Sequence, residues 1–200
     1  STFLVPRDTP GLSVGNEENK MGIRTSNTTD VVFEDMRVPA SALIGKEGEG
    51  FKIAMQTLDM ARAIMGIGAV GVAQRAIDEA VAYSKQRVTF GQPIGKFEAI
   101  QFMIADMEIK TETARQMSLH ALKLQEEGLP YGKESAIAKC YGGDIAVQVA
   151  LDAIQILGGY GYSREYPVEK LLRDAKIFQI YEGTNQVQRM VISRAVMGKF

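Results

Sequence analysis

The 200-residue sequence contains a single cysteine and a single histidine. Cys140 alone cannot form a disulfide within the chain, which is consistent with a reducing compartment. His120 cannot supply the two Glu-x-x-His motifs that a ferritin-like di-iron site needs, and the Cys and His spacing of zinc sites is absent. Without a histidine base nearby in the pattern, we interpret Cys140 as structural rather than nucleophilic. We therefore predict no metal site.

The sequence also lacks a charge excess and long apolar runs. Its formal net charge is −1, so the chain as a whole has no electrostatic case for nucleic acid or an anionic membrane as partner. No apolar run is long enough to span a bilayer, and residues 1–20 lack the layout of a signal peptide. We predict a soluble cytoplasmic protein, or one of the mitochondrial matrix if the source is eukaryotic. Because the chain starts with β-forming residues and no Met, we expect a fragment.

The chain changes character after residue 45. Residues 1–45 are rich in turn and β-forming residues, with short β-prone runs at Thr2–Val5 and Val31–Phe33. From Phe51 onward, apolar residues recur at helical spacing. We predict helices over 51–85, 97–127, 132–157 and 187–197, a helical stretch over 168–180, and a loop over 160–167. The predicted fold class is mainly α: an antiparallel four-helix-type bundle (46–200) preceded by a small partial antiparallel β region (1–45).

Two short motifs each allow a functional and a structural interpretation. "GGYGYS" (158–163) follows a helix and lacks G-x-G-x-x-G spacing, so we interpret it as a helix C-cap rather than a dinucleotide motif. In "FQIYEGTNQVQR" (178–189), Glu182 precedes a Gly-Thr turn that opens a helix. The local sequence does not decide whether Glu182 is an ordinary surface acid or a base.

Three stretches, taken in order, resemble the acyl-CoA dehydrogenase family. They are "KMGIRTSNTTDVVFEDMRVP" (20–39), residues 48–101 with their "LDMAR" and "RVTFGQPIGKF" motifs, and "DAIQILGGYGYSREYPVEKLLRDAKIFQIYEGTNQVQR" (152–189). The resemblance implies FAD-dependent α,β-dehydrogenation of acyl-CoA thioesters in fatty acid metabolism. A carboxylate removes the α-proton while a hydride leaves the β-carbon for the flavin. The resemblance also implies an electron-transfer flavoprotein as partner and a homodimer or homotetramer.

The resemblance assigns Glu182 as the catalytic base. One branch of the family carries its base beside the Asp59–Arg62 segment, where this chain has Ala61, which cannot act as a base. Asp59 and Arg62 match contacts to CoA, although a helical i,i+3 salt bridge also explains the pair. By the same resemblance, Tyr181 and Gly183 line the region of the substrate carbonyl.

The resemblance also gives a set of expected FAD contacts. These are Arg87, Thr89, Gln155, Gly158, Gly159, Thr184 and Gln186. In the family a neighbouring subunit supplies Gln155, Gly158 and Gly159. Structural alternatives remain for two of the set, since Arg87 is equally a solvated loop arginine and Thr184 equally a helix N-cap.

The chain departs from the family in two respects. Glu98 occupies a position where the family commonly has a Gln that helps to hold FAD. The chain has no tryptophan, and it lacks the family's N-terminal helical domain as well as the half of the β-domain whose segments hold the flavin ring. We therefore expect the C-terminal half of such an enzyme. The alternatives are a catalytically inactive helical oligomerisation module without the flavin platform, or a parent enzyme that works as an enoyl-CoA reductase.

Overall fold

The computed structural model describes residues 1–198, which form two compact units. The first unit is Ser1–Leu58 and the second begins at Asp59, so the division lies within the first long helix, α1 (Gly50–Gln86). The domain boundary predicted after residue 45 lies shortly before this helix. Most of the described chain is helical, which confirms the predicted fold class.

The first unit contains two small antiparallel sheets. Strand β1 (Thr2–Phe3) pairs with β4 (Leu43–Ile44), and β2 (Leu12–Val14) pairs with β3 (Val31–Phe33). A 3₁₀ turn, η1 (Ala40–Ala42), precedes β4. All three residues of β3 are exposed, and no apolar side chain among residues 1–58 is fully buried. Hydrogen-bonded strand pairs, rather than an apolar core, organise this unit.

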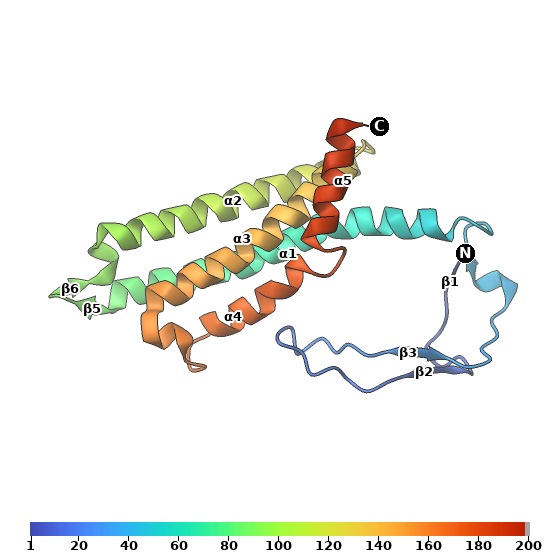
Figure 1. Cartoon of the computed structure of the whole chain (residues 1–200), viewed down its shortest axis with the longest axis horizontal. Helices are drawn as coiled ribbons and strands as arrows, with labels where there is room; N and C mark the ends of the chain where they lie inside the picture. Colours follow the sequence, from blue (N-terminus) through green and yellow to red (C-terminus); the bar gives the residue numbers. More distant parts are fainter. Residues whose placement is uncertain (199–200) are drawn as a thin grey trace. The chain divides into compact units, whose positions relative to one another are not determined.

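The second unit is a helical bundle (Figure 1). After α1 comes a hairpin of β5 (Val88–Thr89) and β6 (Gln92–Pro93), followed by the 3₁₀ turn η2 (Ile94–Lys96). The remaining elements are α2 (Glu98–Glu126), α3 (Gly132–Leu157), η3 (Gly158–Tyr162), α4 (Val168–Ala175), η4 (Lys176–Gln179) and α5 (Asn185–Met197). Short links make α1, α2 and α3 run antiparallel in turn, and α4 and α5 both contact α3. The predicted antiparallel bundle is confirmed.

The bundle core is built largely from small residues. Val70 and Ile77 of α1 pack with Met107 of α2 and Val149 of α3. Alanines at the helix contacts have no exposed surface: Ala63, Ala69, Ala73, Ala76, Ala80, Ala114, Ala121, Ala136, Ala138, Ala146, Ala150 and Ala153. Small side chains let helix axes approach closely while the interior stays dense. We call this apolar contact among α1, α2 and α3 the alanine seam.

One glycine shows how close the helices are. A Cβ atom added to Gly66 of α1 would lie 2.5 Å from the Ser118 Oγ atom on α2 and 3.0 Å from the Ala138 carbonyl oxygen on α3. No larger residue fits there unless a neighbouring helix moves.

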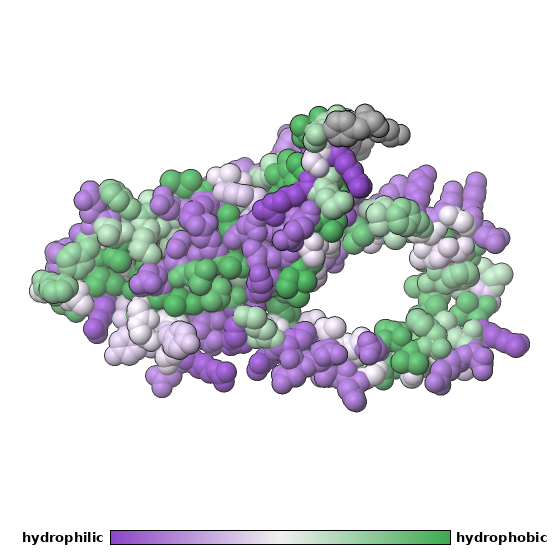
Figure 2. Space-filling view, viewed as in Figure 1, coloured by the Kyte–Doolittle hydropathy of each residue, from purple (hydrophilic) through white to green (hydrophobic). Residues whose placement is uncertain are grey.

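Outside the core, large apolar side chains such as Phe90 are exposed, and Figure 2 shows apolar residues interspersed with hydrophilic ones on the bundle face.

Helices α1 and α2 match their predicted bounds to within one residue at each end, and larger differences occur at two places. Helix α5 begins at Asn185 rather than 187, because the Thr184 Oγ1 atom accepts a hydrogen bond from the Val187 N–H group and caps the helix. The expected loop over 160–167 begins instead as η3. There, a Cβ on Gly161 would lie 2.5 Å from the Ile154 carbonyl oxygen, so the glycine lets the chain fold back on α3. None of the helices within residues 1–198 is long and apolar enough to cross a membrane.

Candidate functional site

Glu182 lies on a tight turn between η4 and α5 and is half-buried. Its backbone φ angle is +56°, and that of Gly183 is +87°. Left-handed backbone is unfavourable for a residue other than glycine, and such strain clusters at functional sites. The two left-handed residues reverse the chain and bring Thr184 to the start of α5.

Two side chains from different helices hold this turn. The Lys139 ammonium on α3 donates to the Gly183 carbonyl oxygen over 2.7 Å. The Gln188 side-chain amide on α5 donates to the carbonyl oxygens of Glu182 (3.1 Å) and Gly183 (2.9 Å). The Glu182 carboxylate itself has no recorded hydrogen bond or ion pair with residues 1–198. The backbone of Glu182 is therefore fixed while its carboxylate stays open to a ligand.

Tyr181 packs beside this turn. Its ring meets that of Phe178 edge-on, with 5.4 Å between the ring centroids. Burial, and secondarily the nearby Glu182 carboxylate, raises the pKa of Tyr181 to about 12. The phenol is therefore neutral near pH 7 and can act only as a hydrogen-bonding or packing group.

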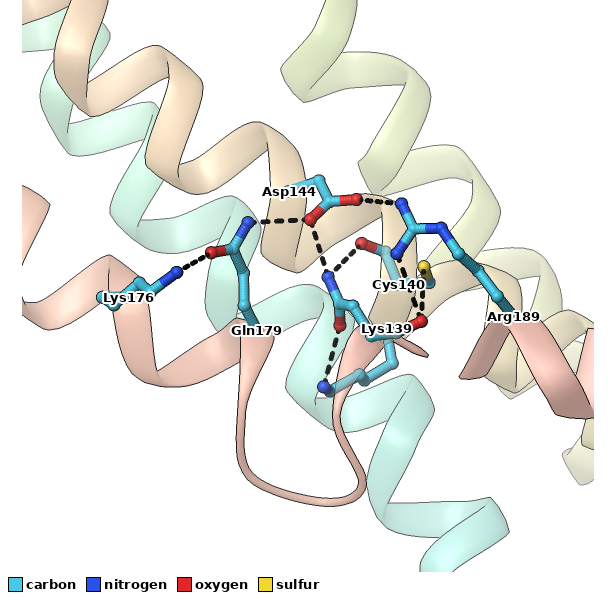
Figure 3. Close-up of polar contacts among 7 residues, drawn as sticks. Lys139, Cys140, Asp144, Lys176, Gln179 and Arg189 are labelled. Atoms are coloured by element: carbon cyan, nitrogen blue, oxygen red, sulfur yellow. Dashed lines mark hydrogen bonds and ion pairs between the residues drawn. The ribbon is translucent and has the colours of Figure 1, made fainter. Parts of the chain in front are cut away.

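A polar cluster connects the turn to α3 (Figure 3). Asp144 on α3 accepts hydrogen bonds from Gln179 (2.8 Å), Asn185 (2.8 Å) and Arg189 (2.7 Å). Asn185 also donates to the Cys140 carbonyl oxygen and accepts from Lys139. These residues come from three elements, η4, α5 and α3. We use the name polar cluster for the following set: Lys139, Cys140, Asp144, Lys176, Gln179, Asn185 and Arg189. Sequence reasoning missed it, because nothing in the spacing of these residues shows that they meet.

Burial and hydrogen bonds shift the pKa values of the ionisable groups in this region, and at Asp144 they act in opposite directions. Burial is the largest influence on Asp144, but hydrogen bonds from Arg189, Asn185 and Gln179 outweigh it and lower the pKa of the carboxyl. Burial lowers the pKa of Lys139 from 10.5 to about 8. Burial also raises the pKa of the Cys140 thiol, which fits the structural role predicted for that cysteine.

The expected CoA contacts pair with each other. The Arg62 Nη1 atom lies 2.6 Å from the Asp59 carboxylate, which is the salt bridge of the structural alternative. Arg62 is 6% exposed, and its buried Nε–H group has no partner among the described residues. Ser135 on α3 donates to the Asp59 carbonyl oxygen and ties α1 to α3 at this level. The pair is thus anchored, with one donor left over.

Four expected FAD contacts line one pocket of about 650 Å³: Arg87, Thr89, Gly158 and Gly159. The Arg87 guanidinium lies 5.9 Å from the centroid of the Tyr160 ring in the same pocket. A Cβ atom on Gly158 or Gly159 would meet nothing within 4 Å, so a side chain there would extend into open space. Gly158 caps α3 with φ +61°, as predicted. A guanidinium, a hydroxyl and open backbone fit the polar half of a nucleotide.

Thr184 and Gln186 line a second pocket of about 580 Å³, which the polar cluster borders with Lys176 and Arg189. The free N–H groups at the start of α5 and the Lys176 ammonium suit an anion, whereas Arg189 pairs with the Asp144 carboxylate of the same pocket over 2.7 Å. Asp144 borders this pocket and Leu157 borders the first, and they are separated by roughly 20 Å along α3. Gln155 is exposed and is not among the residues that line either pocket. Six of the seven expected FAD contacts therefore fall into two groups, one beside the middle of α3 and one at its C-terminal end.

No group of three or more His, Cys, Asp or Glu side chains within residues 1–198 is placed to hold a metal ion.

The sequence of the chain matches that of a known protein family. A family model described as "Acyl-CoA dehydrogenase, C-terminal domain" matches residues 48–197. The chain belongs to the acyl-CoA dehydrogenase family. The members of this family are FAD-dependent flavoproteins.

Individual relatives and solved structures of similar sequence support the same family. The chain is 50% identical to an acyl-CoA dehydrogenase of Bacillus subtilis, covering 99% of this chain and 52% of that protein. It is 49% identical to an NADH-dependent acryloyl-CoA reductase of Anaerotignum propionicum, covering 98% and 50%. The structure of butyryl-CoA dehydrogenase from Megasphaera elsdenii superimposes with a TM-score of 0.96 at 50% identity, covering 98% and 51%.

A further structural match is a chain from the structure described as the electron transferring flavoprotein of Acidaminococcus fermentans. Its TM-score is 0.97 at 52% identity, covering 98% of this chain and 52% of that one. The chain thus spans about half the length of the relatives that it matches.

Proposed function

We propose that this chain forms the C-terminal part of an FAD-dependent acyl-CoA dehydrogenase in which Glu182 is the base. The observation that carries the proposal is the Glu182 turn. A half-buried carboxylate without a recorded partner in residues 1–198 stands on a left-handed backbone that Lys139 and Gln188 hold in place. Restraint of the backbone combined with a free carboxylate is what a base needs and what a structural acid does not.

The chemistry explains why such restraint matters. The α-proton of a thioester is weakly acidic, so a base must be placed against it in a site that excludes water and stabilises charge on the carbonyl oxygen. Glu182 takes the α-proton, and the electrons of that C–H bond form the α,β double bond. Flavin, when bound, accepts the hydride that leaves the β-carbon. The backbone N–H group of Glu182 is a donor available to the thioester oxygen.

Other residues bind and orient in this proposal. Arg62, with its spare Nε–H donor, and Asp59 contact the CoA portion. Tyr181, neutral near pH 7, and Gly183 line the region of the thioester carbonyl. Butyryl-CoA is the first substrate to test, since a butyryl-CoA dehydrogenase is among the structural matches.

The two groups of expected FAD contacts support a shared flavin site. Thr184 and Gln186 would contact the FAD of their own subunit, while Arg87, Thr89, Gln155, Gly158 and Gly159 would contact that of a neighbour. The roughly 20 Å between the two pockets along α3 supports this division. The protein would then be a homodimer or homotetramer. An electron-transfer flavoprotein is the proposed redox partner, and the bacterial relatives favour a cytoplasmic location over the mitochondrial matrix.

Flavin binding tests the proposal first. Two proteins are purified and their visible spectra are recorded. One is the 200-residue chain, and the other is a longer protein that also contains the half of the relatives' length that this chain does not span. We expect the longer protein to carry FAD and its absorbance to bleach when butyryl-CoA or octanoyl-CoA is added. The proposal would be contradicted if the longer protein did not bind FAD, or if acyl-CoA did not bleach the absorbance of its bound flavin. Flavin that binds to the 200-residue chain alone and is bleached by acyl-CoA would eliminate the alternative of an inactive assembly module.

Glu182→Gln tests the base. The variant removes the proton acceptor but keeps the shape, so we expect flavin reduction by acyl-CoA to slow at least about a hundredfold with FAD still bound. Asp8→Asn, an exposed acid in the first unit, is the matched control and should leave the rate unchanged. Near-normal reduction in Glu182→Gln would show that another group takes the proton.

The acryloyl-CoA reductase among the relatives favours a second candidate, the reverse reaction. The same residues would then act in the opposite direction, with Glu182 giving its proton to the α-carbon. Rates measured with butyryl-CoA and an electron acceptor, and with crotonyl-CoA and reduced flavin, distinguish the two directions.

A further inference from the structure

Lys139 is a charged side chain in the interior of the bundle. It stands in the middle of α3 and is 1% exposed, which makes it one of the largest fully buried side chains of the described chain. The structure records no ion pair for it with any of residues 1–198. Burial of an unpaired ammonium is costly, so packing alone would favour an apolar residue of similar length. A lysine at this position therefore calls for a polar role.

The hydrogen bonds of Lys139 point to that role. Its Nζ atom donates to the Gly183 carbonyl oxygen over 2.7 Å and to the Asn185 Oδ1 atom over 2.9 Å. These two acceptors flank Thr184, so one ammonium holds the residues on both sides of the N-cap of α5. Gln188 adds a second donor to Gly183 and one to Glu182. The backbone carbonyl groups of Glu182 and Gly183 are therefore both held by side chains from outside the turn.

The turn requires external support. Glu182 has φ +56°, in the region that side chains disfavour, so the turn would relax toward ordinary backbone angles without restraint. The direction of the Glu182 side chain follows from its own backbone angles. A small rotation of the turn therefore displaces the carboxylate by a distance that matters for proton transfer.

We propose that Lys139 is a positioning residue for Glu182, which fixes the backbone of the turn through Gly183 and Asn185 and so aims the carboxylate at the substrate. Lys139 does not touch the reacting atoms in this role. The role rests on the proposed function, because it presupposes that Glu182 is the base. The restraint of the turn, however, is a property of this chain and is measurable without flavin or substrate.

Hydrogen exchange tests the restraint directly in the 200-residue chain. Lys139→Met keeps the length of the side chain and removes its donor. We expect exchange in the segment 180–187 to accelerate about tenfold to a hundredfold, since charge-assisted hydrogen bonds stabilise this segment locally. Lys133→Met, an exposed lysine in the first turn of the same helix, is the control and should leave the segment unchanged. Equal exchange in both variants would overturn the proposal.

Kinetics test the catalytic consequence in the FAD-loaded enzyme that contains this chain. With Lys139→Met we expect the first-order rate of flavin reduction, per bound flavin, to fall about tenfold to a hundredfold while the Kd for acyl-CoA changes less than about threefold. Lys139→Gln, which restores a neutral donor, should recover part of the rate. A purely structural lysine would lower thermal stability or FAD content but leave the rate per bound flavin normal, and that result would overturn the role.

The hydrogen-exchange and kinetic experiments together distinguish a failure of this inference from a failure of the proposed function. If wild-type holoenzyme shows no flavin reduction, or Glu182→Gln keeps its rate, then the proposed function fails, while hydrogen exchange still decides whether Lys139 restrains the turn. If Lys139→Met does not fold, Gln188→Met removes the side-chain amide that makes the other two hydrogen bonds to the turn and should give the same two effects. Normal exchange and normal reduction rate in Gln188→Met would then count against the proposal.

Discussion

The alanine seam and the polar cluster both attach α3 to its neighbours, but by different interactions. Along the seam, Val149 and its neighbours meet α1 and α2 through apolar contacts. Around Asp144, the attachment consists of hydrogen bonds with defined donors and acceptors. Apolar packing tolerates small shifts, whereas a hydrogen bond constrains both distance and direction. The seam therefore determines that the helices associate, and the polar cluster determines how the Glu182 turn is oriented.

The seam should carry more of the global stability. Met107→Ala empties a fully buried position, so we expect the free energy of unfolding to fall by about 2–5 kcal/mol. Urea unfolding followed by circular dichroism measures the loss. The comparison would fail if Met107→Ala left stability almost unchanged but accelerated exchange in the Glu182 turn.

Gly143 lies where the two regions meet and should affect both. A Cβ atom there would lie 2.7 Å from the Phe178 carbonyl oxygen on η4. Gly143→Ala must therefore push η4 away from α3, and we expect a loss of roughly 1–3 kcal/mol together with slower flavin reduction in the holoenzyme.

Gly71→Ala is the matched control for that substitution. It places the same methyl group on α1 at a position with no neighbour within 4 Å. Alanine favours helix, so we expect a gain of about 0.5–1 kcal/mol. Equal destabilisation by both variants would show that the close contact at Gly143 is not the cause.

Lys139 should leave a signature in the alkaline stability of the chain. Its pKa is lowered to about 8 in the folded state, from 10.5, so between these values the unfolded chain binds more protons. Stability contributed through this group therefore rises with pH across that window, by about 1.4 kcal/mol per pH unit where the two states differ by a full proton. The charges of Cys140, Asp144, Arg62 and Glu182 also act on this group.

Urea unfolding between pH 8 and 10 in wild type and Lys139→Met measures this term. The difference between the two proteins should shift in favour of wild type as pH rises. Parallel curves would mean that the folded and unfolded states titrate Lys139 alike.

Asp144 should give the smallest effect, at acidic pH. Its pKa is lowered in the folded state, so the carboxylate contributes stability that is complete above its ordinary value of 3.8 and is lost as pH falls below it. Thermal unfolding at pH 7 and pH 3 should show that Asp144→Asn is less stable than wild type at pH 7. The gap should narrow at pH 3, and a gap that widens would contradict the assignment.

The same comparison explains what could be predicted from the sequence. The bounds of α3 follow from local signals, because Pro130 precedes it and Gly158 ends it in left-handed conformation. The seam follows from helical periodicity. The start of α5 was missed by two residues, since Thr184 caps through its side chain and extends the helix beyond its apolar pattern.

The polar cluster could not be predicted in the same way. Lys139 and Gly183 are 44 residues apart, and their contact depends on how α3, η4 and α5 pack. A buried lysine looks like a surface lysine in sequence, because the pattern of α3 carries no mark of its partner. Family resemblance indicated Glu182 and the expected flavin contacts, but not the residues that hold the turn.

The separation of the two pockets along α3 has a genetic consequence if subunits share each flavin as proposed. A chain damaged at Arg87 and a chain damaged at Thr184 would each be defective alone, yet a mixed oligomer would contain some sites assembled entirely from intact halves. Co-expression of the two variants should therefore restore part of the activity, and the harm of an allele would depend on the allele with which it is paired.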